Sequence, residues 1–103
     1  MVKGIKFSDQ VFQLLVQVPA GQVTTYKMLA AGCGRPRAVR AVGNILNKNT
    51  KPIIIPCHRV VRTNGQVGGY NGGVRQKLAL LKKEGLKIKN HKLENLAAVL
   101  YRF

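Results

Sequence analysis

Frequent glycine and proline breaks limit the length of every regular element that this chain can form. Such breaks stand at 19–21, 32–34, 65, 67–73 and 85, so the segments between them are short. Proline cannot continue a helix, and glycine favours turns. No apolar run approaches the roughly 20 residues that span a bilayer, and no internal repeat is present. The 103 residues therefore predict one domain built from short elements.

Helical spacing of apolar residues marks the first half of the chain. Apolar residues at 11, 12, 14, 15 and 18 predict a helix over 8–18, with Ser8 or Asp9 as its N-cap. A threonine can cap a short helix over 26–31, and a third helix is expected over 35–46 with Pro36 in its first turn. With the glycine-bearing turn between them, these two helices have the outline of a helix-turn-helix, in which the second helix enters a DNA groove. Because helix pairs are also common packing units, this pattern alone leaves DNA contact open.

The second half of the chain mixes strand and helix signals. The β-branched run 53–55 predicts a short buried strand, and Asn64-Gly65 is typical of a hairpin turn. The spacing over 74–84 predicts a helix that ends at Gly85. A final amphipathic helix is expected over 91–101, with an apolar face at 93, 96, 97 and 100. The predicted fold class is therefore mainly α with a short β element.

The charge of the chain is strongly unbalanced. Lys and Arg number 18 against 3 Asp and Glu, which gives a formal net charge of +15. A folded domain with this charge is expected to bind a polyanion, because its cations displace counterions from phosphates. Charge alone does not separate DNA from RNA or from an anionic membrane, and a ribosomal or chromatin protein would have the same composition. Without a signal peptide or a membrane span, the chain is expected to be cytoplasmic and not to bind a membrane.

Cys57 is the residue at which covalent chemistry could occur, in the sequence Pro56-Cys57-His58-Arg59. Basic neighbours favour the thiolate, which is the nucleophilic form, and lower the pKa of a thiol. Successive side chains of a strand point to opposite faces, so His58 can serve the thiol only if the backbone turns here or a water bridges them. A buried structural cysteine is the alternative interpretation.

The remaining Cys and His residues offer no other site. Cys33 lies in the turn between two expected helices, and both cysteines are expected to be reduced thiols. No C-x2-C or H-x3-H pair is present, so no metal site is expected. His91 is the only other histidine and has no partner pattern, which argues against a protease.

The glycine-rich segment 67–73 and Glu84 each allow two interpretations. Four glycines surround Tyr70, either as a flexible hairpin end or as the wall of a pocket for a flat ligand. The segment matches no phosphate-binding glycine motif, so no nucleotide cofactor, and no cofactor of any kind, is expected. Glu84 can be interpreted as a solvated residue at the end of a helix. Because a carboxylate is unfavourable at a helix C-terminus, it can also be interpreted as the partner of another group, such as a histidine.

Five ordered motifs together resemble the O6-alkylguanine-DNA alkyltransferases, in the C-terminal DNA-binding and active-site domain of that family. They are Gly-x-Val-Thr-Thr-Tyr at 21–26, Pro-Arg-Ala-Val-Arg-Ala-Val-Gly at 36–43, Ile-Pro-Cys-His-Arg-Val-Val at 55–61, Gly-Tyr-Asn-Gly-Gly at 69–73 and Leu-Leu-x-x-Glu-Gly at 80–85. The resemblance covers Phe7 to Leu86. It implies a winged helix-turn-helix-like alkyltransferase domain over 1–87, followed by a basic helical extension over 88–103. Larger relatives carry an N-terminal domain of mixed sheet and helix, and the resemblance, which starts at Phe7, leads us to expect that this domain is missing here.

The resemblance implies a DNA repair protein that flips O6-alkylguanine out of the duplex and transfers the alkyl group irreversibly to Cys57. His58 corresponds to a water-linked base, Glu84 to the carboxylate that orients it, and Asn49 to the residue that holds the preceding turn. The implied substrate-binding residues are Tyr26, Val60, Tyr70, Asn71 and Gly72. The implied DNA-binding residues are Arg40, which fills the gap left by the base, Arg37, Ala38, Ala41, Gly43 and Thr25.

The implied partner is double-stranded DNA, bound through its minor groove by a monomer. Small residues on the second helix suit such docking, with little sequence preference. A non-catalytic alkyltransferase-like protein that only binds the lesion is the alternative. Those relatives typically replace the cysteine, often by tryptophan, whereas this chain has Cys57 and no Trp.

Overall fold

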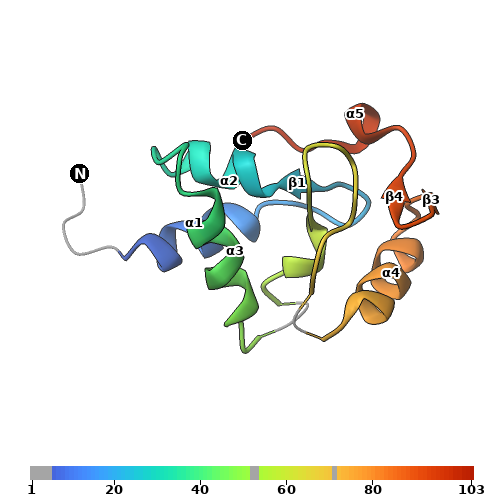
Figure 1. Cartoon of the computed structure of the whole chain (residues 1–103), viewed down its shortest axis with the longest axis horizontal. Helices are drawn as coiled ribbons and strands as arrows, with labels where there is room; N and C mark the ends of the chain where they lie inside the picture. Colours follow the sequence, from blue (N-terminus) through green and yellow to red (C-terminus); the bar gives the residue numbers. More distant parts are fainter. Residues whose placement is uncertain (1–5, 52–53, 71) are drawn as a thin grey trace.

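The computed structural model describes residues 6–51, 54–70 and 72–103. Three helices, α1 (Phe7–Leu15), α2 (Tyr26–Gly32) and α3 (Val39–Asn47), pack together in the first half of the chain (Figure 1). Their apolar faces share one core with the cysteine turn of the site. The buried members of this core are Val11, Leu15, Val18, Leu29, Ala30, Val42, Leu46, Cys57 and Val60.

A short parallel strand pair joins the two halves of the molecule. β1 (Thr24–Thr25) pairs with β2 (Val60–Val61), which follows a single 3-10 turn over Cys57–Arg59. Neighbouring side chains of a strand face opposite sides, so Val60 enters the first core and Val61 enters the second. The cysteine turn is therefore fixed to the seam between two packed cores.

The second core lies beneath α4 (Val74–Lys83) and the C-terminal segment. Gly85, at φ +92°, ends α4, and the Leu86 amide donates back to the Leu81 carbonyl at 3.1 Å, as glycine-terminated helices do. β3 (Ile88–Lys89) and β4 (Lys92–Leu93) form an antiparallel hairpin, and α5 (Leu96–Val99) follows. The buried members of this core are Val23, Val61, Val67, Leu81, Leu86 and Leu93.

Several predicted elements are confirmed. The molecule is mainly helical with short strands, and α2 and α3 form a helix-turn-helix-like pair. The Thr25 hydroxyl caps α2 by accepting from the Met28 amide at 3.0 Å. A turn over Arg62–Gly65 closes with a 2.9 Å hydrogen bond, and Gly65 adopts φ +90°. Its flanks are joined by a further hydrogen bond, from the Arg62 amide to the Gln66 carbonyl at 2.8 Å, and Gln66 also forms a bridge with Lys92.

Two N-terminal boundaries were predicted wrongly. α1 begins after Lys6 with no side-chain cap, so neither Ser8 nor Asp9 is its N-cap. It ends at Leu15, because the amides of the next turn bond three residues back, ahead of a proline. α3 begins at Val39 rather than Arg35, because Arg35 to Ala38 close a separate turn through a 2.9 Å hydrogen bond.

The two remaining errors concern apolar segments whose conformation is set by hydrogen bonding and by turns. Ile54 is 76% exposed in a turn, and Ile55 is half-buried at an isolated β-bridge, so the described part of 53–55 is not a buried strand; Ile53 lies outside the described residues. The helix expected over 91–101 is a hairpin followed by four helical residues. Asn90, His91 and Asn95 have φ between 54° and 60°, and a helix cannot contain such residues.

No helix in the described part of the chain is long and apolar enough to cross a membrane.

Candidate active site

The backbone turns at Cys57, as the resemblance requires. The 3-10 turn Cys57–Arg59 closes through the Arg59 amide, which donates to the Pro56 carbonyl at 2.9 Å. Cys57 is 6% exposed, and its thiol faces the Leu46 carbonyl of α3 at 3.8 Å. The turn thus places the Cys57 sulfur against α3. It directs the next two side chains, His58 and Arg59, toward Glu84 at the end of α4.

Asn49 connects the sulfur to the chain that precedes it. Its side-chain amide donates to Cys57 Sγ at 2.7 Å and to the Ile55 carbonyl at 2.9 Å. Its carbonyl oxygen accepts from the Lys51 amide at 2.9 Å. One buried side chain therefore both holds the turn and supplies a hydrogen-bond donor to the reactive atom.

His58, Glu84 and Arg59 form a hydrogen-bonded cluster behind the thiol. His58 is fully buried, and its Nε2 lies 3.0 Å from Glu84 Oε2. Arg59 donates to both carboxylate oxygens, at 3.0 Å from Nε to Oε1 and 2.5 Å from Nη2 to Oε2, and also to the Val18 carbonyl. Burial alone would raise the pKa of Glu84, but the hydrogen bonds from Arg59 and His58 outweigh it and lower the pKa. Glu84 is therefore a carboxylate.

His58 Nδ1 is buried and has no hydrogen-bonding partner among the described residues. Because its Nε2 is bound to Glu84, only Nδ1 is free to exchange a proton with another group. This arrangement fits a histidine that acts on a neighbouring group through Nδ1.

The prediction that Cys57 is ionised in the resting protein is wrong. Burial raises the pKa of Cys57, and the lowering effects of the Asn49 hydrogen bond, its own backbone and Lys77 do not compensate. The two basic neighbours that suggested a thiolate instead pair with Glu84. The resting sulfur is a thiol that must lose its proton before it can react.

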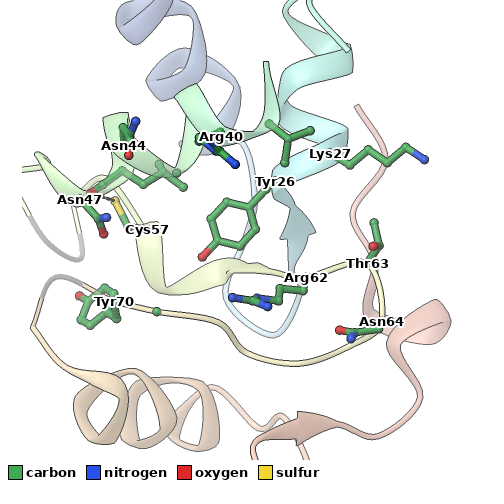
Figure 2. A pocket seen from close by; sticks show the side chains of 14 residues that line it. Tyr26, Lys27, Arg40, Asn44, Asn47, Cys57, Arg62, Thr63, Asn64 and Tyr70 are labelled. Carbon is green, nitrogen blue, oxygen red and sulfur yellow. Dashed lines mark hydrogen bonds between the residues drawn. The ribbon is translucent and has the colours of Figure 1, made fainter. Parts of the chain in front are cut away.

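Cys57 lines a cavity of about 540 Å³ that opens on the face of α2 and α3 (Figure 2). This volume is in the range of small-ligand pockets. The Tyr26 side chain projects into the hollow, and Arg40, Arg62 and Tyr70 surround it (Figure 2). Other lining residues are Lys27, Val39, Gly43, Asn44, Leu46, Asn47, Thr63, Asn64 and Gly69.

Two glycines are needed for the shape of this region. A Cβ on Gly68, which has φ +75°, would lie 3.1 Å from the Tyr26 hydroxyl. A Cβ on Gly72 would lie 2.1 Å from a Gln76 oxygen and 3.1 Å from the Tyr70 ring. Gly72 lines a second hollow, of about 340 Å³, that also reaches Cys57 and Tyr70. The interpretation of this segment as a pocket wall is therefore consistent with its packing.

Only some of the predicted substrate-binding residues line the cavity. Tyr26 and Tyr70 line the cavity, and burial raises the pKa of both phenols. The Tyr70 hydroxyl is buried without a partner among the described residues. The Val60 side chain is buried in the first core. Asn71 lies outside the described residues.

The predicted DNA-binding residues cluster around the start of α3, with one exception. Arg40 and Gly43 line the cavity mouth, and Arg37 is exposed in the turn that precedes α3. Ala38, the N-cap of α3, and Ala41 are half-buried. Thr25 is buried and caps α2.

Three basic residues of the site were not predicted from the sequence. Arg59 binds Glu84, Arg62 lines the cavity, and Lys77 is fully buried behind it. Arg59 is part of the cysteine motif, but its charge was interpreted as favouring the thiolate and not as binding Glu84. Nothing marks Lys77 in the sequence, because it is one lysine among many on an apparently amphipathic helix.

No group of three or more His, Cys, Asp or Glu side chains in the described ranges could hold a metal ion.

The fold and the site define the class of the protein: a basic, helix-turn-helix-like domain with a cysteine-centred cavity beside its second helix. The sequence model of one family, "6-O-methylguanine DNA methyltransferase, DNA binding domain", matches residues 6–86. The chain belongs to this family.

Curated and structural relatives agree with this assignment. The chain is 49% identical over 82 residues to a methylated-DNA–protein-cysteine methyltransferase of Salmonella typhimurium, over 80% of this chain and 48% of that protein. The crystal structure of Mycobacterium tuberculosis OGT in complex with DNA has a TM-score of 0.75 at 39% identity, covering 82% of this chain and 52% of that one. The chain spans about half the length, or less, of the curated relatives it matches.

A third relative shares only the fold. The structure of S. pombe Atl1 in complex with damaged DNA containing O6-carboxymethylguanine has a TM-score of 0.81 at 24% identity. That similarity covers 93% of this chain and 94% of Atl1, so it includes most of the segment after residue 86.

Proposed function

We propose that this chain is a DNA repair alkyltransferase that binds duplex DNA containing O6-alkylguanine and accepts the alkyl group irreversibly on Cys57. The observation that carries the proposal is the position of the Cys57 sulfur. It is hydrogen-bonded by Asn49 at the wall of a cavity that opens on the helix-turn-helix face. A structural cysteine would need neither the cavity nor the buried histidine and carboxylate behind it.

The reaction needs a proton carrier because the resting sulfur is a thiol. In the proposed step, the proton leaves Sγ through a bridging water to His58 Nδ1, and Glu84 stabilises the resulting imidazolium. The thiolate attacks the alkyl carbon, the S–C bond forms, and the C–O6 bond breaks. Its electron pair goes to the guanine, which takes up a proton and leaves as unmodified guanine. The thioether is stable, so each molecule reacts once.

A base stacked in a duplex cannot reach a thiol at this depth, so the proposal includes extrusion of the damaged guanine. Flipping a base costs a few kcal/mol. Arg40, which is exposed, and Tyr26 both line the cavity; in the proposal Arg40 fills the gap in the duplex and Tyr26 contacts the flipped base. Docking through the minor groove by a monomer, with the charge of +15 supplying affinity for phosphates, completes the proposal.

A lesion-binding protein without transfer activity is the second candidate. The chain shares its fold with Atl1, whose structure is in complex with damaged DNA, but at 24% identity this similarity shows the fold alone and does not distinguish the two candidates. Both candidates bind the same lesion, and they differ in whether Cys57 is consumed.

Mass spectrometry of the intact protein after incubation with O6-methylguanine duplex DNA separates the two. Transfer predicts that one methyl group replaces one hydrogen, and that Cys57→Ser abolishes the gain while Cys33→Ser does not. Tight binding to the modified duplex with no change of mass would reject the transferase in favour of the lesion-binding protein.

A further inference from the structure

Lys77 is the largest fully buried side chain in the described part of the protein. It lies on α4, and it makes no ion pair with any described carboxylate. Burying an ammonium without a counter-ion is costly. The reaction as written above does not use this residue, so its burial requires an explanation of its own.

The contacts of Lys77 connect two parts of the site. Its Nζ donates to the Val60 carbonyl at 2.6 Å and to the Gly69 carbonyl at 3.1 Å. Val60 begins the strand that follows the cysteine turn, and Gly69 belongs to the glycine-rich wall of the cavity. These two segments are separated in sequence and meet here through one ammonium group.

The same ammonium lies near Tyr26, a residue that lines the cavity. Nζ lies 5.9 Å from the centre of the Tyr26 ring, within the range of a cation–π contact. The charged or titratable groups that act on Lys77 from the neighbouring elements are Cys57, on the 3-10 turn, and Arg62, after β2. Lys77 thus contacts the residue expected to meet the base and interacts electrostatically with the residue expected to take the alkyl group.

The electrostatic coupling between Lys77 and Cys57 acts in both directions. Burial lowers the pKa of Lys77 to about 7, while the Cys57 thiolate raises it and Arg62 lowers it. Conversely, Lys77 lowers the pKa of Cys57 against the effect of burial. Each group therefore favours the ionised form of the other, as opposite charges do.

We propose that Lys77 is a positioning residue for alkyl transfer, which holds the strand after the cysteine turn against the glycine-rich wall of the cavity and, when protonated, supplies the positive charge that stabilises the Cys57 thiolate. The proposal rests on the proposed transferase function. The thiol proton leaves by way of His58, so Lys77 takes no proton from the sulfur. Lys77 acts in its protonated form, which a pKa of about 7 leaves about half populated near neutral pH. Lys77 therefore acts on the sulfur through charge and on the cavity through two carbonyls.

The first test measures the reactivity of the Cys57 thiol in the absence of DNA. In a Cys33→Ser background, the rate of Cys57 alkylation by iodoacetamide is followed against pH for the parent, Lys77→Met, Lys77→Arg and Lys82→Met. Lys77→Met should react about tenfold more slowly near neutral pH, with its pH profile displaced upward, because a nearby opposite charge commonly changes a pKa by a unit or more. Lys77→Arg should retain most of the rate.

Lys82→Met is the matched control, since it removes a charge from the exposed side of the same helix. It should react within about twofold of the parent. A Lys77→Met rate equal to the parent, or an equal slowing in Lys82→Met, would overturn the proposal. Circular dichroism of each variant establishes that the fold is kept.

The second test needs no change at Lys77, so it decides the question even if Lys77→Met does not fold. The Lys77 side chain is titrated by carbon-13 NMR after Cys57 is blocked either with iodoacetate, which leaves a carboxylate on the sulfur, or with iodoacetamide, which leaves a neutral amide. The negative group should raise the pKa of Lys77 relative to the neutral group, because opposite charges favour each other's ionised form. Identical titrations of the two blocked forms would show that the two groups are not coupled.

Repair assays then separate this proposal from the function on which it rests. In single-turnover repair, Lys77→Met should slow transfer at saturating DNA while the Kd for DNA stays within about twofold. If the parent protein transfers no alkyl group, the transferase function fails, and the two thiol measurements still decide the role of Lys77.

Discussion

Gly43 provides a test in which stability and DNA binding should change in opposite directions. It lies inside α3, where glycine is less favourable than alanine by about 0.5–1 kcal/mol. A Cβ built at this position meets no atom within 4 Å, so nothing in the folded protein opposes a methyl group there. Gly43→Ala should therefore stabilise the domain and raise its Tm by about 2–8 °C.

The same methyl group should weaken DNA binding, because Gly43 lines the cavity mouth on the helix expected to enter the groove. An extra methyl in a close contact costs about 1 kcal/mol or more, which is roughly a fivefold loss of affinity. Gly43→Leu should bind more weakly still.

Thermal melting gives the first quantity, and fluorescence anisotropy with a labelled duplex at fixed salt gives the second. Gln13→Ala, an exposed substitution on α1, is the control that should leave affinity unchanged. If Gly43→Ala and Gly43→Leu bind DNA as tightly as the parent, the prediction that α3 approaches the duplex closely at Gly43 is refuted.

Four further substitutions test other parts of the site and fold. Arg40→Ala should slow repair of duplex DNA far more than reaction with free O6-alkylguanine, since only a duplex has a gap to fill; equal losses in the two rate assays would contradict this role. Asn49→Ala removes the hydrogen bond to the sulfur, so the pKa of Cys57 should rise and its alkylation slow, and an unchanged pH–rate profile would count against the contact. The pKa of Glu84 is lowered in the folded protein, so its stabilising effect is complete above its ordinary pKa of 4.5 and is lost as the pH falls through the lower folded value. Glu84→Gln should flatten this acid-side loss in urea titrations, whereas an identical pH dependence would exclude the carboxylate as its source. Leu93→Ala, in the buried part of β4, should cost about 2–5 kcal/mol of unfolding free energy, and a loss below 0.5 kcal/mol would mean that the C-terminal segment is not part of the core.

The helices could be predicted because their apolar spacing and their end signals agree. Thr25 before α2 and Gly85 after α4 occupy the positions at which the structure starts and stops these helices. The C-terminal segment carries equally regular apolar residues, yet Asn90 and Asn95 adopt left-handed conformations there. Periodicity reports which residues are buried, and it does not distinguish a helix from a hairpin whose turns fall between them.

The site was partly predictable for a related reason. A resemblance to a family carries over residues in its motifs, so His58 and Glu84 were expected together and lie 3.0 Å apart. The protonation of Cys57 was not predictable, because it depends on burial and on which partners its basic neighbours choose. Lys77 was missed because the sequence does not distinguish a buried lysine from an exposed one.

The protonation and burial of Cys57 should also affect how fast this residue is oxidised. Peroxides oxidise thiolates to sulfenic acid far faster than they oxidise thiols, and enclosure slows the encounter further. If Cys57 accepts one alkyl group irreversibly, as proposed, an oxidant that reached it first would inactivate the molecule. The burial that raises the pKa of Cys57 thus also protects the thiol from oxidation before any reaction.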